Sequence, residues 1–173
     1  MGLEAEHLLD LIVPRDDKRL LVIVETDGCF ADGVSVSTGC GVGRRTLRVE
    51  DYGKVAATFI DIDAGKSVRI APGRDARKLA RGYAPQAQSR WQSQLIGYQQ
   101  MPAEELFTWQ PVTLVTPVAE IVGRPGSRTK CDECGEEIIN QREIPEGNKV
   151  KCQSCGGDSY YKVSLIADTT HLA

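Results

Sequence analysis

The segment LLVIVETDGCFADGVSVSTGC, residues 20–40, decides the expected fold. Its first five residues are apolar without polar alternation, which predicts a strand that is covered on both faces and central to its sheet. Residues 26–40 then follow as a loop at the carboxyl end of that strand, a favoured place for functional sites. The two cysteines of this segment, Cys29 and Cys40, are therefore the first candidates for site residues.

Further elements are expected on both sides of this strand. A helical spacing of apolar residues predicts an opening helix over 3–11, and two β-rich runs at 58–62 and 67–71 predict a hairpin. Asp75 can cap a following helix, after which Trp91, Leu95 and Tyr98 repeat the helical spacing. The aromatic residues Trp91, Tyr98, Phe107 and Trp109 fit a helix-face core or a dimer seam better than a ligand cage. A short helix is expected at 103–107, and the run 111–121, broken by Pro117, is expected to be an edge strand.

The segment GRPGS, residues 123–127, is typical of a hinge between domains. We therefore expect an α+β domain over 1–123, with a small mixed sheet and packed helices, and a second domain over 124–173. The chain has 173 residues, of which 41% are hydrophobic, enough for one ordinary core and a small additional module.

Charge and hydropathy exclude several classes of protein. A net charge of -3 gives no basic face for broad nucleic-acid binding, so a nucleic-acid partner is not expected. The longest apolar run, residues 20–24, is too short to cross a bilayer, and the N-terminus has no secretion signal. We expect a cytoplasmic protein without a membrane partner. The six cysteines agree with a reducing compartment because four of them form C-x-x-C pairs.

The most specific motif is a four-cysteine box made of Cys131-x-x-Cys134 and Cys152-x-x-Cys155. The 17 residues between the pairs fall in the range of structural zinc ribbons, and each pair is followed by glycine, which lets the backbone turn and aim amides at sulfur. Four thiolates fill a tetrahedral ion, so this zinc should hold structure and perform no chemistry. Two questions stay open: whether the ribbon also docks a partner, and whether an iron-sulfur cluster takes the place of zinc.

Several residues outside the box carry a family resemblance. They are Thr26-Asp27-Gly28-Cys29, Asp32-Gly33-Val34-x-Val36-x-Thr38-Gly39-Cys40, Gly43, Asp51-Tyr52-Gly53-Lys54 and Thr58-Phe59. Over about residues 20–72 the chain resembles the FmdE family of proteins associated with formylmethanofuran dehydrogenase. The later Cys131-Asp-Glu-Cys134 stretch is similar to the ribbon that many members append, which itself resembles the DksA/TraR type of zinc finger.

The resemblance implies a metal-binding α+β protein, often a homodimer, linked to a molybdenum- or tungsten-dependent formylmethanofuran dehydrogenase. Family members usually begin with a His-x-His-x-x-Cys-Pro-Gly motif that this chain lacks; its one N-terminal histidine is His7. Cys29 and Cys40 match the family's loop cysteines, but two thiols alone are a poor cage for zinc. They remain open as an incomplete second metal site, as ordinary buried thiols or as a redox pair.

Three functions are consistent with these patterns. The first is an accessory or interaction protein of the FmdE type, with zinc as its metal. The second is a metal-dependent enzyme or metallochaperone that uses a site near Cys29 and Cys40. The third is a DksA/TraR-like regulator, against which the acidic net charge counts. The glycines of 39–43 with Arg44, and the carboxylates of Asp27, Asp32 and Asp51, are better explained by close backbone packing and turns than by an anion loop or acid-base catalysis. No catalytic residue is assigned.

Overall fold

The computed structural model describes residues 1–123 and 126–164. The chain divides into two compact units, Met1–Ile121 and Val122–Ala173, and each is described by itself. The division lies two residues before the hinge that the sequence predicts. Within the described ranges, no helix combines the length and the apolar character that crossing a bilayer requires.

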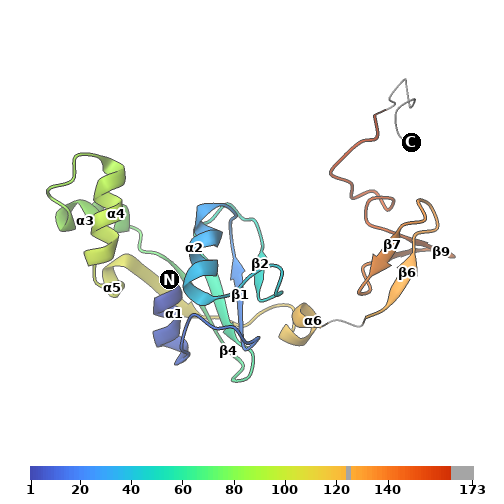
Figure 1. Cartoon of the computed structure of the whole chain (residues 1–173), viewed down its shortest axis with the longest axis horizontal. Helices are drawn as coiled ribbons and strands as arrows, with labels where there is room; N and C mark the ends of the chain where they lie inside the picture. Colours follow the sequence, from blue (N-terminus) through green and yellow to red (C-terminus); the bar gives the residue numbers. More distant parts are fainter. Residues whose placement is uncertain (124–125, 165–173) are drawn as a thin grey trace. The chain divides into compact units, whose positions relative to one another are not determined.

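The first unit is built on a mixed sheet in the order β2-β1-β3-β4-β5 (Figure 1). β2 is parallel to β1, and the other neighbouring strands are antiparallel. The expected strand at 20–25 is β1 and occupies an interior position, next to the middle strand, β3. The expected hairpin is formed by β3 and β4. The strand bounds are β1 Leu20–Val24, β2 Leu47–Val49, β3 Ala57–Asp61, β4 Lys66–Pro72 and β5 Phe107–Pro111.

The core lies between one face of this sheet and two helices, α1 (Gly2–Leu9) and α2 (Cys29–Thr38). Alternate strand residues, such as Val22 and Phe59, point to that face because strand side chains alternate with a period of two. Residues of the opposite parity, including Leu21 and Ile60, are also fully buried. Both faces of β1 and β3 are therefore covered, and the predicted α+β class with a small mixed sheet is confirmed.

The segment expected to be a loop, residues 26–40, is mostly the helix α2, so that expectation is wrong. Glycines mark both ends of the helix: Gly28 precedes it with φ 70° and Gly39 follows it with φ 72°, a left-handed conformation that glycine tolerates. The helix contains glycine, serine and valine, which are weak helix formers, but Val34 and Thr38 are buried against the core. Tertiary packing therefore overrides local propensity here.

Gly39 also lies where the chain approaches itself closely. The Arg15 amide donates to the Thr38 carbonyl over 2.8 Å, and a Cβ on Gly39 would lie 2.3 Å from the Arg15 carbonyl oxygen. Arg44 donates to the Gly39 carbonyl over 3.2 Å. These contacts agree with close backbone packing at Gly39, whereas a Cβ on Gly41 or Gly43 would meet no atom within 4 Å, so close packing does not explain those two glycines.

Two buried carboxylates, at the ends of β1 and β3, form ion pairs with arginines. Asp61, 1% exposed, accepts hydrogen bonds from Arg19 at 2.9 and 2.8 Å and from the amides of Asp63 and Ala64. Glu25, 7% exposed, pairs with Arg69, whose Nη2 lies 2.7 Å from Oε2. Hydrogen bonds from Arg19 and Arg69 lower the pKa values of Asp61 and Glu25 respectively, although burial alone would raise them.

Three helices connect β4 to β5: α3 (Ala76–Tyr83), α4 (Arg90–Gln100) and α5 (Ala103–Leu106). The helical period over 91–98 is as expected, but the buried positions of α4 are Ser93 and Gly97. A Cβ on Gly97 would lie 2.4 Å from the Ala80 carbonyl oxygen, so small residues let the two helices meet closely. Trp91 is 71% exposed, so the core is ruled out as its position and the dimer seam stays a prediction.

The expected edge strand at 111–121 lies elsewhere. The edges of the sheet are β2 and β5, and Pro111 is the last residue of β5, as expected for a residue that cannot extend a hydrogen-bond ladder. Residues Val118–Val122 instead form the short helix α6.

In its described residues, the second unit contains two small antiparallel hairpins. β6 (Arg128–Lys130) pairs with β7 (Glu137–Ile139), and β8 (Ile144–Glu146) pairs with β9 (Lys149–Lys151). Among the described residues of this unit, the buried side chains are Cys131 and Ile138. So small an apolar core cannot by itself hold the unit together.

Candidate metal centre

The two hairpins bring the four box cysteines together. Their sulfur atoms all lie within 4.8 Å of one another, and the Cys134 and Cys152 sulfurs are 3.9 Å apart. A tetrahedral ion with metal–sulfur bonds of about 2.3 Å places its ligands roughly 3.8 Å from one another. The spacing of the sulfurs therefore fits a four-coordinate metal, and no other group of three or more ligand-type side chains converges within the described ranges.

Each C-x-x-C pair closes a tight turn that depends on the following glycine. The Gly135 amide donates to the Cys131 carbonyl and the Gly156 amide to the Cys152 carbonyl, each over 2.9 Å. Gly135 has φ 78°, a conformation that few other residues adopt without strain. Amides also point at the sulfurs: those of Cys152 and Cys155 lie 3.3 and 3.4 Å from the sulfurs of Cys131 and Cys152.

These amides favour thiolates at part of the cluster. Backbone donors from Cys134 and Cys152 lower the pKa of Cys131 to about 6. A hydrogen bond to Cys152, together with burial, raises the pKa of Cys155, because both favour the protonated thiol. A bound dication would favour the thiolate form of all four cysteines instead.

Asp132 joins the two hairpins and was missed as a site residue from the sequence. Its amide donates to the Val150 carbonyl over 2.8 Å, and its carboxylate accepts from the Val150 amide over 2.6 Å. Lys151 lies 2.7 Å from Glu146 and 3.2 Å from Glu133, so it links β9 to the first turn. The position of Asp132, one residue after the first ligand, was the available signal.

The structure separates Cys29 from Cys40. Cys29 is the first residue of α2 and is exposed, whereas Cys40 is two residues beyond its last residue and only 3% exposed. A ten-residue helix is about 15 Å long, so the two sulfurs cannot share one ion in this conformation. Cys40 donates to the Leu20 carbonyl over 3.4 Å, and burial raises its pKa, which is the environment of an ordinary buried thiol.

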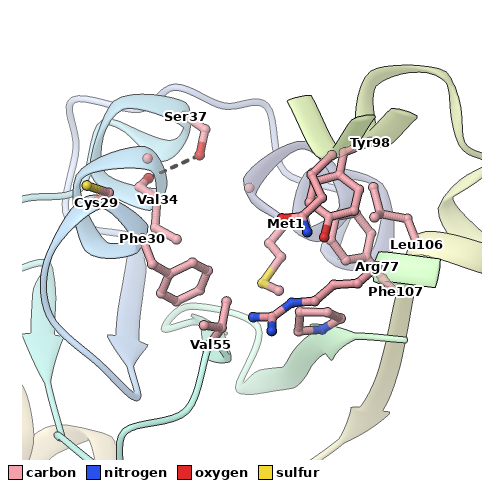
Figure 2. Close-up of a pocket in the computed structure, with 14 residues that line it drawn as sticks. Met1, Cys29, Phe30, Val34, Ser37, Val55, Arg77, Tyr98, Leu106 and Phe107 are labelled. Carbon is pink, nitrogen blue, oxygen red and sulfur yellow. Dashed lines mark hydrogen bonds between the residues drawn. The ribbon is translucent and has the colours of Figure 1, made fainter. Parts of the chain in front are cut away.

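The carboxylates near these cysteines do not form a cluster. Asp27, Asp32 and Asp51 are all exposed, and Asp51 accepts a hydrogen bond from the Gly53 amide, as in a turn. Cys29 instead lies at the edge of a cavity whose other walls come from α1, α3 and α4 (Figure 2). Nothing in the sequence pattern predicted that cavity.

Comparison with known proteins places the first unit in a family. Residues 1–108 match the family described as "FmdE, Molybdenum formylmethanofuran dehydrogenase operon". A solved structure from Syntrophus aciditrophicus, that of an FmdE-like protein of the tungsten formylmethanofuran dehydrogenase type, aligns with a TM-score of 0.56 at 22% identity. The alignment covers 85% of this chain and 76% of that one, and at this identity it shows a common fold.

A curated relative matches a shorter stretch. The probable S-adenosyl-L-methionine-binding protein of Archaeoglobus fulgidus is 43% identical over 51 residues, which are 30% of this chain and 14% of that protein. So short a share of the relative says little about the whole of either protein. The family match is much broader, since it covers well over half of the residues, and it includes the segment on which the resemblance was drawn. This chain therefore belongs to the FmdE family.

Proposed function

We propose that this chain is a zinc-binding accessory protein of the FmdE type, in which a ribbon over 124–173 is held by a structural zinc ion. The observation that carries the proposal is the convergence of Cys131, Cys134, Cys152 and Cys155 at distances that suit a tetrahedral tetrathiolate. Four protein ligands leave no open position for water or substrate. The zinc would therefore stabilise the ribbon, which has few buried side chains of its own.

Metal analysis of the purified protein tests this proposal. We expect one zinc per chain, lost in the variants Cys131→Ser and Cys152→Ser. The matched variants Cys29→Ser and Cys40→Ser should keep the full metal content, because their sulfurs lie outside the cluster. A colourless protein agrees with zinc. Visible absorption together with bound iron and sulfide would show that an iron-sulfur cluster occupies the site in place of zinc.

The ribbon is also a reasonable docking module for a larger enzyme. Most side chains of the described ribbon are exposed, and among them are the large aromatic residues Tyr160 and Tyr161. The family description links FmdE proteins to a molybdenum formylmethanofuran dehydrogenase operon, so we propose a molybdenum- or tungsten-dependent formylmethanofuran dehydrogenase as the partner. Co-purification of that enzyme with the wild-type chain but not with Cys152→Ser supports docking through the ribbon. Failure of both proteins to retain the enzyme would contradict the partnership.

We further propose that the first unit forms a homodimer through its exposed apolar helical surface. On α4, Trp91 is 71% exposed and Leu95 is 46% exposed. Large exposed aromatic residues favour burial in an interface. Light scattering at micromolar concentration should give twice the chain mass, and Trp91→Glu should give the monomer mass. We also propose that the protein is located in the cytoplasm, because thiols stay reduced there and can bind zinc. Localising a tagged chain in cells tests this.

The geometry does not favour a metal-dependent enzyme or metallochaperone built on Cys29 and Cys40, because α2 holds their sulfurs apart. We therefore assign no reaction to the chain. A DksA/TraR-like regulator lacks a supporting structural observation, and the mixed charges around the box, such as the pair of Lys151 with Glu133, do not form a basic face.

A further inference from the structure

A cavity of about 500 Å³ lies in the first unit, within the size range of small-molecule sites. Phe30 and Val34 of α2 form one wall, and Leu106 and Phe107 contribute to the opposite wall (Figure 2). Val55 also lines the cavity. These walls are apolar and include two aromatic rings, so the cavity favours the apolar body of an organic molecule over a hydrated ion.

A guanidinium group faces this apolar space. Arg77 of α3 lines the cavity, and Figure 2 shows its side chain extending between Met1 and Phe107 with the guanidinium group toward Val55. Among the described residues, no aspartate or glutamate lines the cavity. Within residues 1–123 and 126–164, the Arg77 guanidinium has no ion pair or side-chain hydrogen bond. Gln94 and Tyr98 of α4 add neutral polar groups to the same lining.

The surroundings of Arg77 are also positive. Residues 74–90 contain five cationic side chains and one acidic side chain, Asp75, so their formal charge is +5 - 1 = +4. Three of these cations, Lys78, Arg81 and Arg90, line a second hollow together with Arg77. The rest of the chain carries enough acid to make the total -3. A local positive field in an acidic protein attracts anions to this surface and raises their rate of association.

We propose that this cavity binds a small organic acid, with its apolar body against Phe30 and Phe107 and its anionic head group on Arg77. A guanidinium group recognises carboxylate and phosphate alike through paired N–H donors, so these head groups share one chemistry. Cys29 is the sole thiol that the described residues contribute to the lining, and zinc requires more ligands than that. The site is independent of the ribbon, since its residues all belong to the first unit.

The test compares a charged probe with a neutral one of the same shape. Isothermal titration calorimetry of the whole chain with 4-phenylbutyrate should show saturable binding, and amide shifts in NMR should locate it at Gly33 and Val34. The neutral 4-phenylbutanamide should bind at least about tenfold more weakly, because a charge-assisted hydrogen bond is lost. Phenylpropyl phosphate serves as the phosphate probe and distinguishes the two head groups.

Three variants localise the binding. Arg77→Gln should weaken 4-phenylbutyrate by about tenfold or more and remove the preference for the acid over the amide. Lys78→Gln is the matched control: it removes the same charge from the same helix but does not line the cavity, so the affinity should change by less than about twofold. Gly33→Leu should abolish binding while the protein stays folded, because a Cβ at Gly33 meets no atom within 4 Å and the larger side chain enters the cavity.

Four results would overturn the proposal. The first is that neither anionic probe binds saturably up to about 10 mM, the weakest affinity expected of a specific site. The second is that 4-phenylbutyrate and 4-phenylbutanamide bind with equal affinity, and the third is that Arg77→Gln binds 4-phenylbutyrate as tightly as the wild type. The fourth is that the cavity is already filled in the free protein. The last would appear as protection of Gly33 and Val34 that disappears on dilution, which identifies a second copy of the chain as the occupant.

Discussion

Loss of one zinc ligand should unfold the ribbon while the first unit stays intact, and the structure allows this expectation to be worked through. The perturbation is Cys152→Ser. Among residues 126–164, Ile138 is the buried apolar residue that is not a ligand, and its burial contributes only about 2–3 kcal/mol. Isolated two-stranded hairpins are marginally stable at best in water, and each ladder here has three residue pairs. A structural zinc contributes about 10 kcal/mol or more, so it dominates.

Hydrogen exchange followed by mass spectrometry measures this effect. Peptides that cover 128–158 should exchange at least about 100-fold faster in Cys152→Ser than in the wild type, because local unfolding of the ribbon then costs almost no free energy. Peptides that contain β1 and β3 should not change, since their residues are buried in a separate core. Cys29→Ser, the same substitution at an exposed cysteine outside the cluster, is the control. Equal protection of the ribbon in a metal-free Cys152→Ser protein would refute the reasoning.

The other predictions concern the first unit and are measured as free energies of unfolding in urea. Asp61→Ala should cost about 2 kcal/mol through its lost charged hydrogen bonds, whereas Asp63→Ala, at an exposed neighbour, should cost less than about 0.5 kcal/mol. Gly39→Ala should cost more than about 2 kcal/mol, because its left-handed backbone and short backbone contact both oppose a Cβ. Gly33→Ala, a helix position with open space, should instead stabilise by up to about 1 kcal/mol; a loss there would be contrary to the argument. The lowered pKa of Glu25 should stabilise the fold fully above the ordinary glutamate pKa of 4.5, and progressively less as the pH falls below it through the lowered value; Glu25→Gln should flatten this dependence, and an unchanged profile would disprove it.

The sheet could be predicted from the sequence because its strands carry a local signal. The β-branched run of β1 and the turn composition between β3 and β4 are both readable along the chain. The helix α2 could not be predicted in the same way, since its residues are weak helix formers and its stability comes from the burial of Val34 and Thr38. The glycines at both of its ends were visible, but glycine also marks loops.

The face of α4 was predicted only in part: Tyr98 packs against the buried cluster of Ala76, Ala80 and Met101, but Trp91 does not. The aromatic residues at 91 and 98 repeat with a helical period, but the helix packs through Gly97 against Ala80 because small side chains allow a closer approach. The sequence shows the period of a helix more clearly than it shows which element the helix packs against. Trp91 is consequently exposed, which leaves an apolar surface that the dimer proposal uses.

For the metal centre, the spacing within and between the C-x-x-C pairs was enough to predict that four sulfurs converge. The spacing of Cys29 and Cys40 was not enough to predict whether their sulfurs converge, because the segment between them forms a helix that holds them apart. The organic-acid cavity had no local signal at all. Its walls come from five helices, α1 to α5, from the end of β4, the start of β5 and Val55, and residues so distant in sequence are brought together only by the fold.

The division of the four ligands between the two hairpins has a kinetic consequence. The turn after β6 supplies two sulfurs and the segment after β9 supplies the other two, and residues 140–143 are the tether between the hairpins. An arriving ion first binds one pair of cysteines, and its dissociation then competes with binding of the second pair. The effective concentration of the second pair at the ion falls slowly as the tether lengthens. The retention time of the metal is thus governed by a stretch of chain that never touches it.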